Sequence, residues 1–211
     1  ETLMRRLIGE MGLEEIVIAY GQTECSPVNH ATEIDDSFEH RTTSVGRPHY
    51  NWECKIINPE SGEICAYGET GEVCSRGYGV MAEYWGEPER TAETIDCDGF
   101  LHSGDLGEMD DEGFVKITGR IKDMIIRGGE NIYPREVEEF LSTHPDIQEV
   151  QVFGVPDEKY GEQVAAWVVL REGATIALDE IHRYCEGQIT HFKIPSYIKI
   201  VSEYPMTVTG K

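Results

Sequence analysis

The sequence is poor in basic residues and has no long apolar run. Its 211 residues hold 18 Lys and Arg against 40 Asp and Glu, which gives a formal net charge of -22. A field of that sign repels phosphate backbones and anionic membranes, so we expect no nucleic-acid partner. The longest apolar run, Val164 to Leu170, is too short to span a bilayer, and we expect no transmembrane segment.

Zinc-binding cysteine patterns are also missing. The six cysteines, at positions 25, 54, 65, 74, 97 and 185, form no C-x-x-C pair and have no nearby histidine pair, which argues against a zinc site. Scattered free thiols fit a reducing compartment, so we expect a cytoplasmic protein. Because the chain opens on Glu1 within a partial helix pattern, we expect it to be a piece of a longer protein. The sequence leaves open whether the preceding part contains an organelle-targeting segment.

The first part of the chain predicts a helix, a strand and then a β-rich region. Apolar residues at positions 3, 4, 7 and 8 favour a helix that stops at Gly12, and Ile16 to Tyr20 predicts a short buried strand. From residue 44 to 119, brief apolar runs between Gly, Pro, Asn and Asp indicate short antiparallel strands in a small barrel or sandwich. Asp110 to Gly113 has the composition of a hairpin turn.

After Arg120 the pattern changes to alternating helices and strands. Pro134 suits the first turn of a helix with Val137, Phe140 and Leu141 on its apolar face. We expect strands at 149–155, 163–170 and 197–202, and a second helix at 178–188. The sequence therefore predicts an α+β fold with two parts, residues 1–121 and 122–211, that meet at Lys122.

Two segments carry residue types that bind nucleotides. Tyr20 to Glu24, "YGQTE", offers an aromatic face for a base and a carboxylate for magnesium, although polar residues at a strand end are also common without a ligand. Asp105, in "HSGDLG", is either a turn former that binds its own backbone or an acceptor for ribose hydroxyls.

A third segment is rich in glycine and arginine. Gly128 and Gly129 supply a permissive backbone near Arg120 and Arg127, but no G-x-G-x-x-G spacing is present. The terminal "TGK" also fails as a phosphate-binding P-loop, because Pro205 stands where that motif has its first glycine.

The order of these segments resembles one enzyme superfamily. "YGQTE", "SGD", "GRIKDMIIRGGENIYPREVE" and "YPMTVTGK" follow one another as in the C-terminal part of adenylate-forming acyl-CoA synthetases, and "HFKIP" is similar to the fatty and medium-chain members. The resemblance implies an ATP-dependent ligase that makes acyl-AMP from a carboxylic acid and Mg-ATP. It then transfers the acyl group to coenzyme A. Residues 1–121 would end the AMP-binding N-terminal domain, and 122–211 would be a mobile C-terminal domain.

The resemblance also implies site residues. Tyr20 would lie against adenine, Thr23 would contact phosphate, Glu24 would hold Mg²⁺, Asp105 would take the ribose hydroxyls and Arg120 would reach ribose or phosphate. The other implied residues are Gly21, Gln22 and Ile117 at the nucleotide, Lys122 as the hinge, Gly129 at the pantetheine tunnel and Lys211 as the catalytic lysine.

Lys211 has a clear electrostatic task in this reaction. A carboxylate attacks a phosphate, and an ammonium between these two anions lowers the barrier. The superfamily's phosphate loop lies upstream of this segment, so we expect the chain alone to be a poor catalyst. Two alternatives stay open: an aryl- or amino-acid-activating domain that loads a carrier protein, and a non-catalytic nucleotide-binding relative. The sequence does not indicate the acyl chain length or the oligomeric state.

Overall fold

The chain divides into two compact units. The computed structural model describes residues 2–205, and the division falls between Ile121 and Lys122. Each unit mixes helices with mostly antiparallel β-sheet, so the predicted α+β fold class is confirmed. Among the described residues, none of the helices is long and apolar enough to cross a bilayer.

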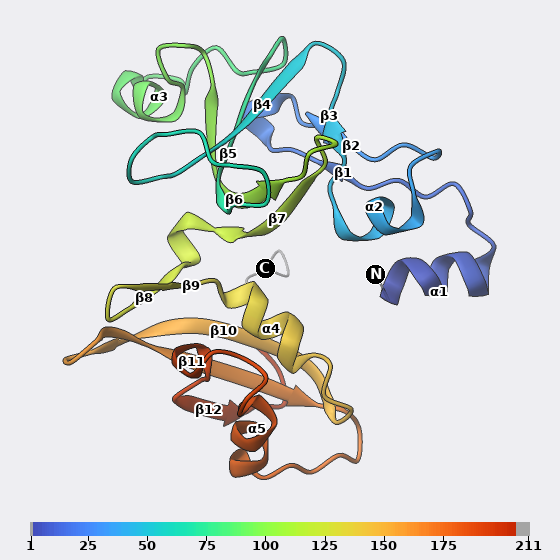
Figure 1. Cartoon of the computed structure of the whole chain (residues 1–211), viewed down its shortest axis with the longest axis vertical. Helices are drawn as coiled ribbons and strands as arrows, with labels where there is room; N and C mark the ends of the chain where they lie inside the picture. The colour runs from blue at the N-terminus through green and yellow to red at the C-terminus, as the bar shows by residue number, and fades with distance from the viewer. Residues whose placement is uncertain (1, 206–211) are drawn as a thin grey trace. The chain divides into compact units, whose positions relative to one another are not determined.

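The first unit contains three helices and two antiparallel sheets (Figure 1). Its elements are α1 (Thr2–Met11), β1 (Ala19–Tyr20), the 3-10 turn η1 (Thr23–Cys25), β2 (His30–Ala31), α2 (Phe38–Thr43), β3 (Arg47–Pro48), β4 (Trp52–Ile57), β5 (Gly71–Gly77), α3 (Pro88–Thr94), β6 (Leu101–Met109) and β7 (Val115–Arg120). β1, β2 and β3 form the small sheet, and β4 to β7 form the larger one in sequence order. The region expected to be a barrel or sandwich is therefore a four-strand meander with β4 and β7 at its edges.

The larger sheet contains the predicted hairpin. Between β6 and β7, the Gly113 amide donates to the Asp110 carbonyl over 3.1 Å. The Asp110 carboxylate also accepts from the Phe114 amide over 2.8 Å. Val45 and Gly46, just before β3, exchange backbone hydrogen bonds with Val115 in β7, which joins the two sheets.

The predicted strand from Ile16 to Tyr20 is wrong in length and in burial. Only Ala19 and Tyr20 pair with a neighbour, through His30 and Ala31 in β2. Val17 lies exposed, and Ile16 lies outside the strand. Apolar residues predict a buried strand only if another surface covers them, and the described residues provide no such cover at Val17.

Up to residue 205, the second unit forms a five-stranded sheet with two α-helices (Figure 1). Its elements are the 3-10 turn η2 (Ile121–Asp123, which spans the division), β8 (Ile125–Arg127), β9 (Glu130–Ile132), α4 (Pro134–Leu141), β10 (Ile147–Asp157), β11 (Gly161–Leu170), α5 (Leu178–Cys185), the 3-10 turn η3 (His191–Lys193) and β12 (Tyr197–Ile200). β10 pairs antiparallel with β11, and β12 pairs parallel with β11.

One face of this sheet carries the core. Val137 and Leu141 of α4 pack with Ile181 of α5 against Val152 and Val164. The predicted apolar face of the helix after Pro134 is confirmed, because Phe140 also packs on this cluster. Phe153 and Trp167, which form an edge-to-face pair, lie on the other side of the sheet by strand alternation.

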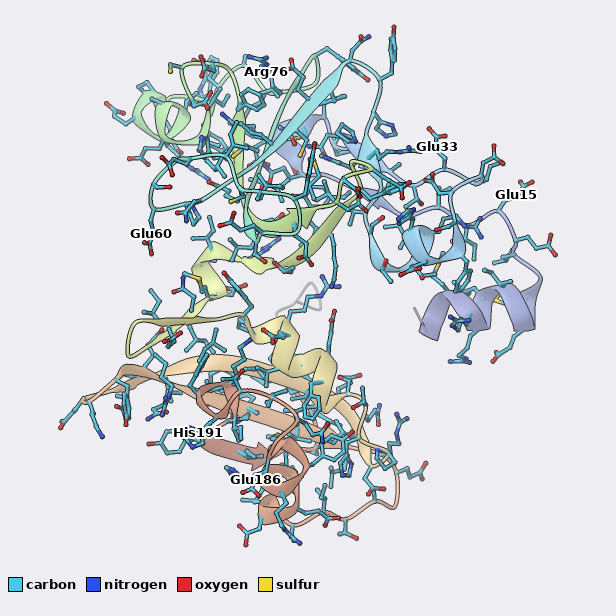
Figure 2. The ribbon with its side chains drawn as sticks, in the orientation of Figure 1. Glu15, Glu33, Glu60, Arg76, Glu186 and His191 are labelled. Atoms are coloured by element: carbon cyan, nitrogen blue, oxygen red, sulfur yellow. The ribbon has the colours of Figure 1, made fainter. Side chains whose placement is uncertain are left out.

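Exposed acidic groups account for much of the net charge. Glu15, Glu33 and Glu60 lie on the surface of the first unit, and Glu186 lies on the surface of the second (Figure 2). The six cysteines are all free thiols.

Candidate functional site

Asp105 forms the centre of a polar cluster in the first unit. Its Oδ2 accepts a hydrogen bond from the Tyr20 hydroxyl over 2.8 Å. Its Oδ1 accepts from Nε of Arg120 over 3.0 Å. The Asp105 side chain is largely buried, while the Arg120 side chain is 57% exposed. The fold thus joins three residues that the sequence places 85 and 15 positions apart.

An irregularity in β6 gives Asp105 its position. β5 and β6 pair at Glu72 with Leu106 and at Cys74 with His102, so β6 has two extra residues between these pairs. Gly104 adopts φ +72 there, a conformation that favours glycine. The Asp105 amide donates to Ser103 Oγ over 3.0 Å. Ser103 therefore stabilises the local turn, and the Asp105 carboxylate faces Tyr20 and Arg120.

Tyr20 remains a hydrogen-bond donor to this carboxylate. Burial raises the pKa of the Tyr20 hydroxyl far above its usual value, and the charge of Asp105 raises it further. The phenol is therefore protonated at every physiological pH. The Tyr20 ring packs edge-on against His30, with 5.7 Å between ring centroids. Tyr20 and Ile117 also pack on one hydrophobic cluster with Ile56, so two predicted nucleotide-site residues meet there.

Glu24 lies in η1 and is held by a residue that the sequence did not indicate. The Tyr84 hydroxyl donates to Glu24 Oε1 over 2.7 Å. Burial raises the pKa of Tyr84, and the hydrogen bond to Glu24 raises it further. The Glu24 carbonyl accepts from the Met81 amide over 2.8 Å, which fixes η1 against the segment before α3. Glu24 is a carboxylate that could take a hard cation such as Mg²⁺.

The other residues of "YGQTE" differ in their surroundings. A side chain on Gly21 would place its Cβ 2.1 Å from the Pro27 carbonyl oxygen, so packing alone requires glycine there. The Gln22 carbonyl accepts from the Cys25 amide over 2.8 Å and begins the 3-10 turn. Thr23 is exposed.

Two candidate residues, Lys122 and Gly129, lie in the part of the second unit that the structure describes. Lys122 is the first residue of that unit and lies in η2. Gly129 has φ +89 and forms, with Gly128 at φ +62, the two-residue turn between β8 and β9. The proposed catalytic Lys211 lies outside the described residues.

A second cluster, beside Asp105, was not expected from the sequence. Glu72, Cys74 and His102 bring ligand-type atoms within 4.8 Å of one another. His102 Nδ1 lies 2.8 Å from Glu72 Oε2 and 3.6 Å from Cys74 Sγ. Cysteine spacing gives no indication of this group, because strand pairing creates it. The only hint of this cluster in the sequence is a charged residue, Glu72, inside the run "GEVC", all of which is buried.

Known proteins give an independent comparison. Residues 1–85 match the AMP-binding enzyme family, and residues 136–211 match the AMP-binding enzyme C-terminal domain. The chain is 49% identical over 209 residues to the mitochondrial medium-chain acyl-CoA ligase ACSF2 of Bos taurus, and 48% identical to that of Homo sapiens. In both comparisons the match covers 99% of this chain and 34% of the relative. The chain thus spans about a third of the length of these relatives.

Solved structures agree with the sequence matches. ATP-bound MatB from Rhodopseudomonas palustris superposes with a TM-score of 0.87 at 35% identity, covering 92% of this chain and 38% of MatB. The o-succinylbenzoate CoA synthetase MenE from Bacillus subtilis, in complex with OSB-AMP, gives a TM-score of 0.85 at 32% identity, covering 100% of this chain and 42% of MenE. The chain therefore belongs to the AMP-binding enzymes and corresponds to the C-terminal part of their acyl-CoA ligases.

Proposed function

We propose that this chain is the C-terminal third of an ATP-dependent acid-thiol ligase. The complete enzyme, here called the full-length parent, converts a carboxylic acid and ATP to acyl-AMP and pyrophosphate. It then transfers the acyl group to the thiol of coenzyme A and releases AMP. The observation that carries this proposal is the Asp105 carboxylate held between Tyr20 and Arg120, in a chain whose relatives are acyl-CoA ligases.

The Asp105 cluster suits a ribose. A carboxylate accepts two hydrogen bonds from a vicinal diol, as acidic residues do in dinucleotide folds. The Tyr20 hydroxyl and the Arg120 guanidinium already bind one oxygen each. Each oxygen retains a further lone pair for a ribose hydroxyl. Tyr20 offers its ring to adenine, and Ile117, Gly21 and Gln22 complete the proposed nucleotide site.

Glu24 and Thr23 are the proposed phosphate-side residues. Magnesium would neutralise phosphate oxygens when it is bound, and Glu24 is the carboxylate that we propose holds it. The Tyr84 hydroxyl binds one oxygen of Glu24 and limits its rotation. We propose that the exposed Thr23 hydroxyl donates to phosphate.

Only the first of the two half-reactions needs an added positive charge. In the first, an acid carboxylate attacks the α-phosphate, and the Lys211 ammonium would stabilise the negative charge that accumulates. Loss of one such electrostatic group costs on the order of 10²-fold in rate. In the second, the coenzyme A thiol attacks the acyl carbon and AMP leaves. We propose that rotation at Lys122 between these steps withdraws Lys211 from the reacting groups and brings Gly129 to the coenzyme A side.

The acid is proposed to be a medium-chain fatty acid. This rests on the two relatives named medium-chain acyl-CoA ligase, because MatB and MenE are less similar to the chain. We propose that the 211-residue chain does not catalyse adenylation efficiently by itself.

Mass spectrometry of the products tests the proposal. The full-length parent is incubated with ATP, Mg²⁺, coenzyme A and straight-chain acids of increasing length. We expect acyl-AMP and then acyl-CoA, with the highest rate for medium-length acids. Asp105→Ala should lower kcat/KM about 10- to 100-fold because two hydrogen bonds to ribose are lost. Glu60→Ala, which removes an exposed carboxylate, is the control and should keep the rate.

Three results would contradict parts of this proposal. Absence of acyl-AMP with every acid would point to a non-catalytic nucleotide-binding protein. Acyl transfer to a carrier protein and not to coenzyme A would identify the carrier-loading class. Pyrophosphate exchange by the isolated 211-residue chain would contradict its proposed dependence on the preceding part.

A further inference from the structure

Glu72 is a buried carboxylate with no place in the reaction described above. It lies in β5 and is 7% exposed. Its Oε1 accepts a hydrogen bond from the Gly104 amide over 2.9 Å. Its Oε2 lies 2.8 Å from His102 Nδ1. Both partners belong to β6, one and three residues before Asp105.

The Gly104 contact replaces a lost strand hydrogen bond. The two extra residues of β6 interrupt the pairing with β5 between Leu106 and His102. A backbone amide left without a partner in this half-buried region is costly. The Glu72 side chain, which extends from β5, accepts the hydrogen bond that the Gly104 amide donates. This contact forms at the point where Gly104 has φ +72. The shape of the segment that ends in Asp105 therefore depends on Glu72.

The Glu72 carboxylate is itself held in place. His102 Nε2 lies 3.7 Å from Asp96 Oδ2. Asp96 is bound in turn by Lys55 over 3.2 Å. Glu72, His102, Asp96 and Lys55 thus form a chain of polar contacts that runs from β5 through β6 to β4. Such connected contacts reduce the freedom of each member.

The same residues are less suited to a metal ion. Both Glu72 oxygens already have hydrogen-bonding partners in Gly104 and His102. Burial, and then the charge of Glu72, raise the pKa of the Cys74 thiol far above its usual value, which disfavours the thiolate that binds metals. The Lys55 ammonium, which binds Asp96, adds positive charge to the same network. These contacts favour a structural task for the cluster.

We propose that Glu72 is a positioning residue for Asp105, which it holds at the orientation that receives the ribose hydroxyls. This inference rests on the proposed function, because Asp105 is a ribose-binding residue only if the chain binds a nucleotide. Glu72 acts through the Gly104 amide and His102 and touches no substrate. Its expected effect is on the discrimination between nucleotides with and without a 2′-hydroxyl.

Three variants test the inference. Glu72→Ala removes both contacts. Glu72→Gln keeps an oxygen for the Gly104 amide and a donor for neutral His102. Asp110→Ala is the matched control, because the Asp110 carboxylate also binds two backbone amides, those of Glu112 and Phe114, at the other end of β6.

The first measurement needs no nucleotide. Hydrogen exchange by mass spectrometry follows a peptide that covers residues 101–106 in the 211-residue chain. We expect exchange to accelerate at least about tenfold in Glu72→Ala and to remain near the unsubstituted rate in Glu72→Gln and Asp110→Ala. Unchanged exchange in Glu72→Ala would overturn the inference, whatever the protein binds.

The second measurement compares ATP with 2′-deoxy-ATP by calorimetry in the full-length parent. We expect the unsubstituted parent to prefer ATP about tenfold or more, and Glu72→Ala to reduce this preference to within about threefold. Glu72→Gln should restore the preference, and Asp110→Ala should retain it. A preference that survives in Glu72→Ala would refute the positioning task, whereas a parent that binds neither nucleotide would refute the proposed function.

Discussion

His30 should make the first unit sensitive to mild acid. Its side chain is fully buried, its Nδ1 bonds Asn29 Oδ1 over 3.0 Å and its Nε2 has no partner in the described structure. Burial lowers the pKa of His30 from 6.5 to about 4, and the neighbouring His49 contributes in the same direction. Protonation would add a positive charge next to the Tyr20 ring, on an imidazole whose Nε2 has no hydrogen-bond acceptor among the described residues.

The sign and size of the effect follow from the two pKa values. The unfolded chain takes up a proton near pH 6.5, whereas folded His30 resists protonation down to about pH 4. Stability is therefore full above pH 6.5 and is lost as the pH falls toward 4. Between about pH 7.5 and about pH 5, the loss that His30 contributes is about 2 kcal/mol.

The assay isolates this contribution from other titrating groups. The free energy of unfolding is measured by denaturant-dependent hydrogen exchange of peptides from β4 to β6, at both pH values. His30→Phe keeps a ring of similar size without a titrating group, so its loss on acidification should be about 2 kcal/mol smaller than that of the unsubstituted chain. His191→Gln, at an exposed position of the second unit (Figure 2), is the control and should follow the unsubstituted chain.

An equal pH dependence for the unsubstituted chain and His30→Phe would refute this reasoning. It would mean that folded His30 accepts a proton as readily as the unfolded chain does. In the full-length parent, the same acidification should weaken ATP binding, because the Tyr20 ring rests on His30.

Further predictions concern Glu24, the β8–β9 turn and Lys211. Tyr84→Phe removes the hydroxyl that holds Glu24, and we expect the Mg²⁺ concentration at half-maximal acyl-AMP formation to rise about tenfold. An unchanged Mg²⁺ requirement would exclude this task. Gly129→Ala, at φ +89, should destabilise the second unit by about 1 kcal/mol in denaturant titrations, and Gly129→Asn should cost less because asparagine tolerates this backbone better. Equal costs would argue against strain. Lys211→Ala should abolish acyl-AMP formation in the full-length parent but preserve transfer from supplied acyl-AMP to coenzyme A, and equal loss of both steps would contradict a step-specific task.

Local sequence patterns predicted much of the second unit. The helix after Pro134 and the strands of β10 and β11 follow from apolar periodicity, because both elements bury one face on a core within the same unit. The β8–β9 hairpin was missed, although Gly128 and Gly129 form a two-residue turn that glycine pairs favour. Its strands of three residues are too short to show an alternating pattern.

The sequence predicted candidate site residues, but it did not predict which of them contact one another. Motif order indicated Tyr20, Glu24, Asp105 and Arg120. The Tyr20 to Asp105 hydrogen bond forms between strands that are far apart in the sequence, so local sequence patterns do not indicate it. The same holds for Tyr84, which lies 60 positions from Glu24.

The register of β6 and β7 bears on how an intermediate could be retained. Asp105 and Arg120 are direct cross-strand partners, and Lys122 follows Arg120 by two residues. The strand ladder therefore fixes the backbone of Arg120 two residues before the residue at which rotation is proposed. A change of torsion angles at Lys122 leaves the carboxylate and guanidinium pair intact, so in the proposed reaction the ribose of acyl-AMP would stay bound to this pair while the torsion angles change. If the proposed reaction is right, loss of that ladder would expose the adenylate to water before the second half-reaction.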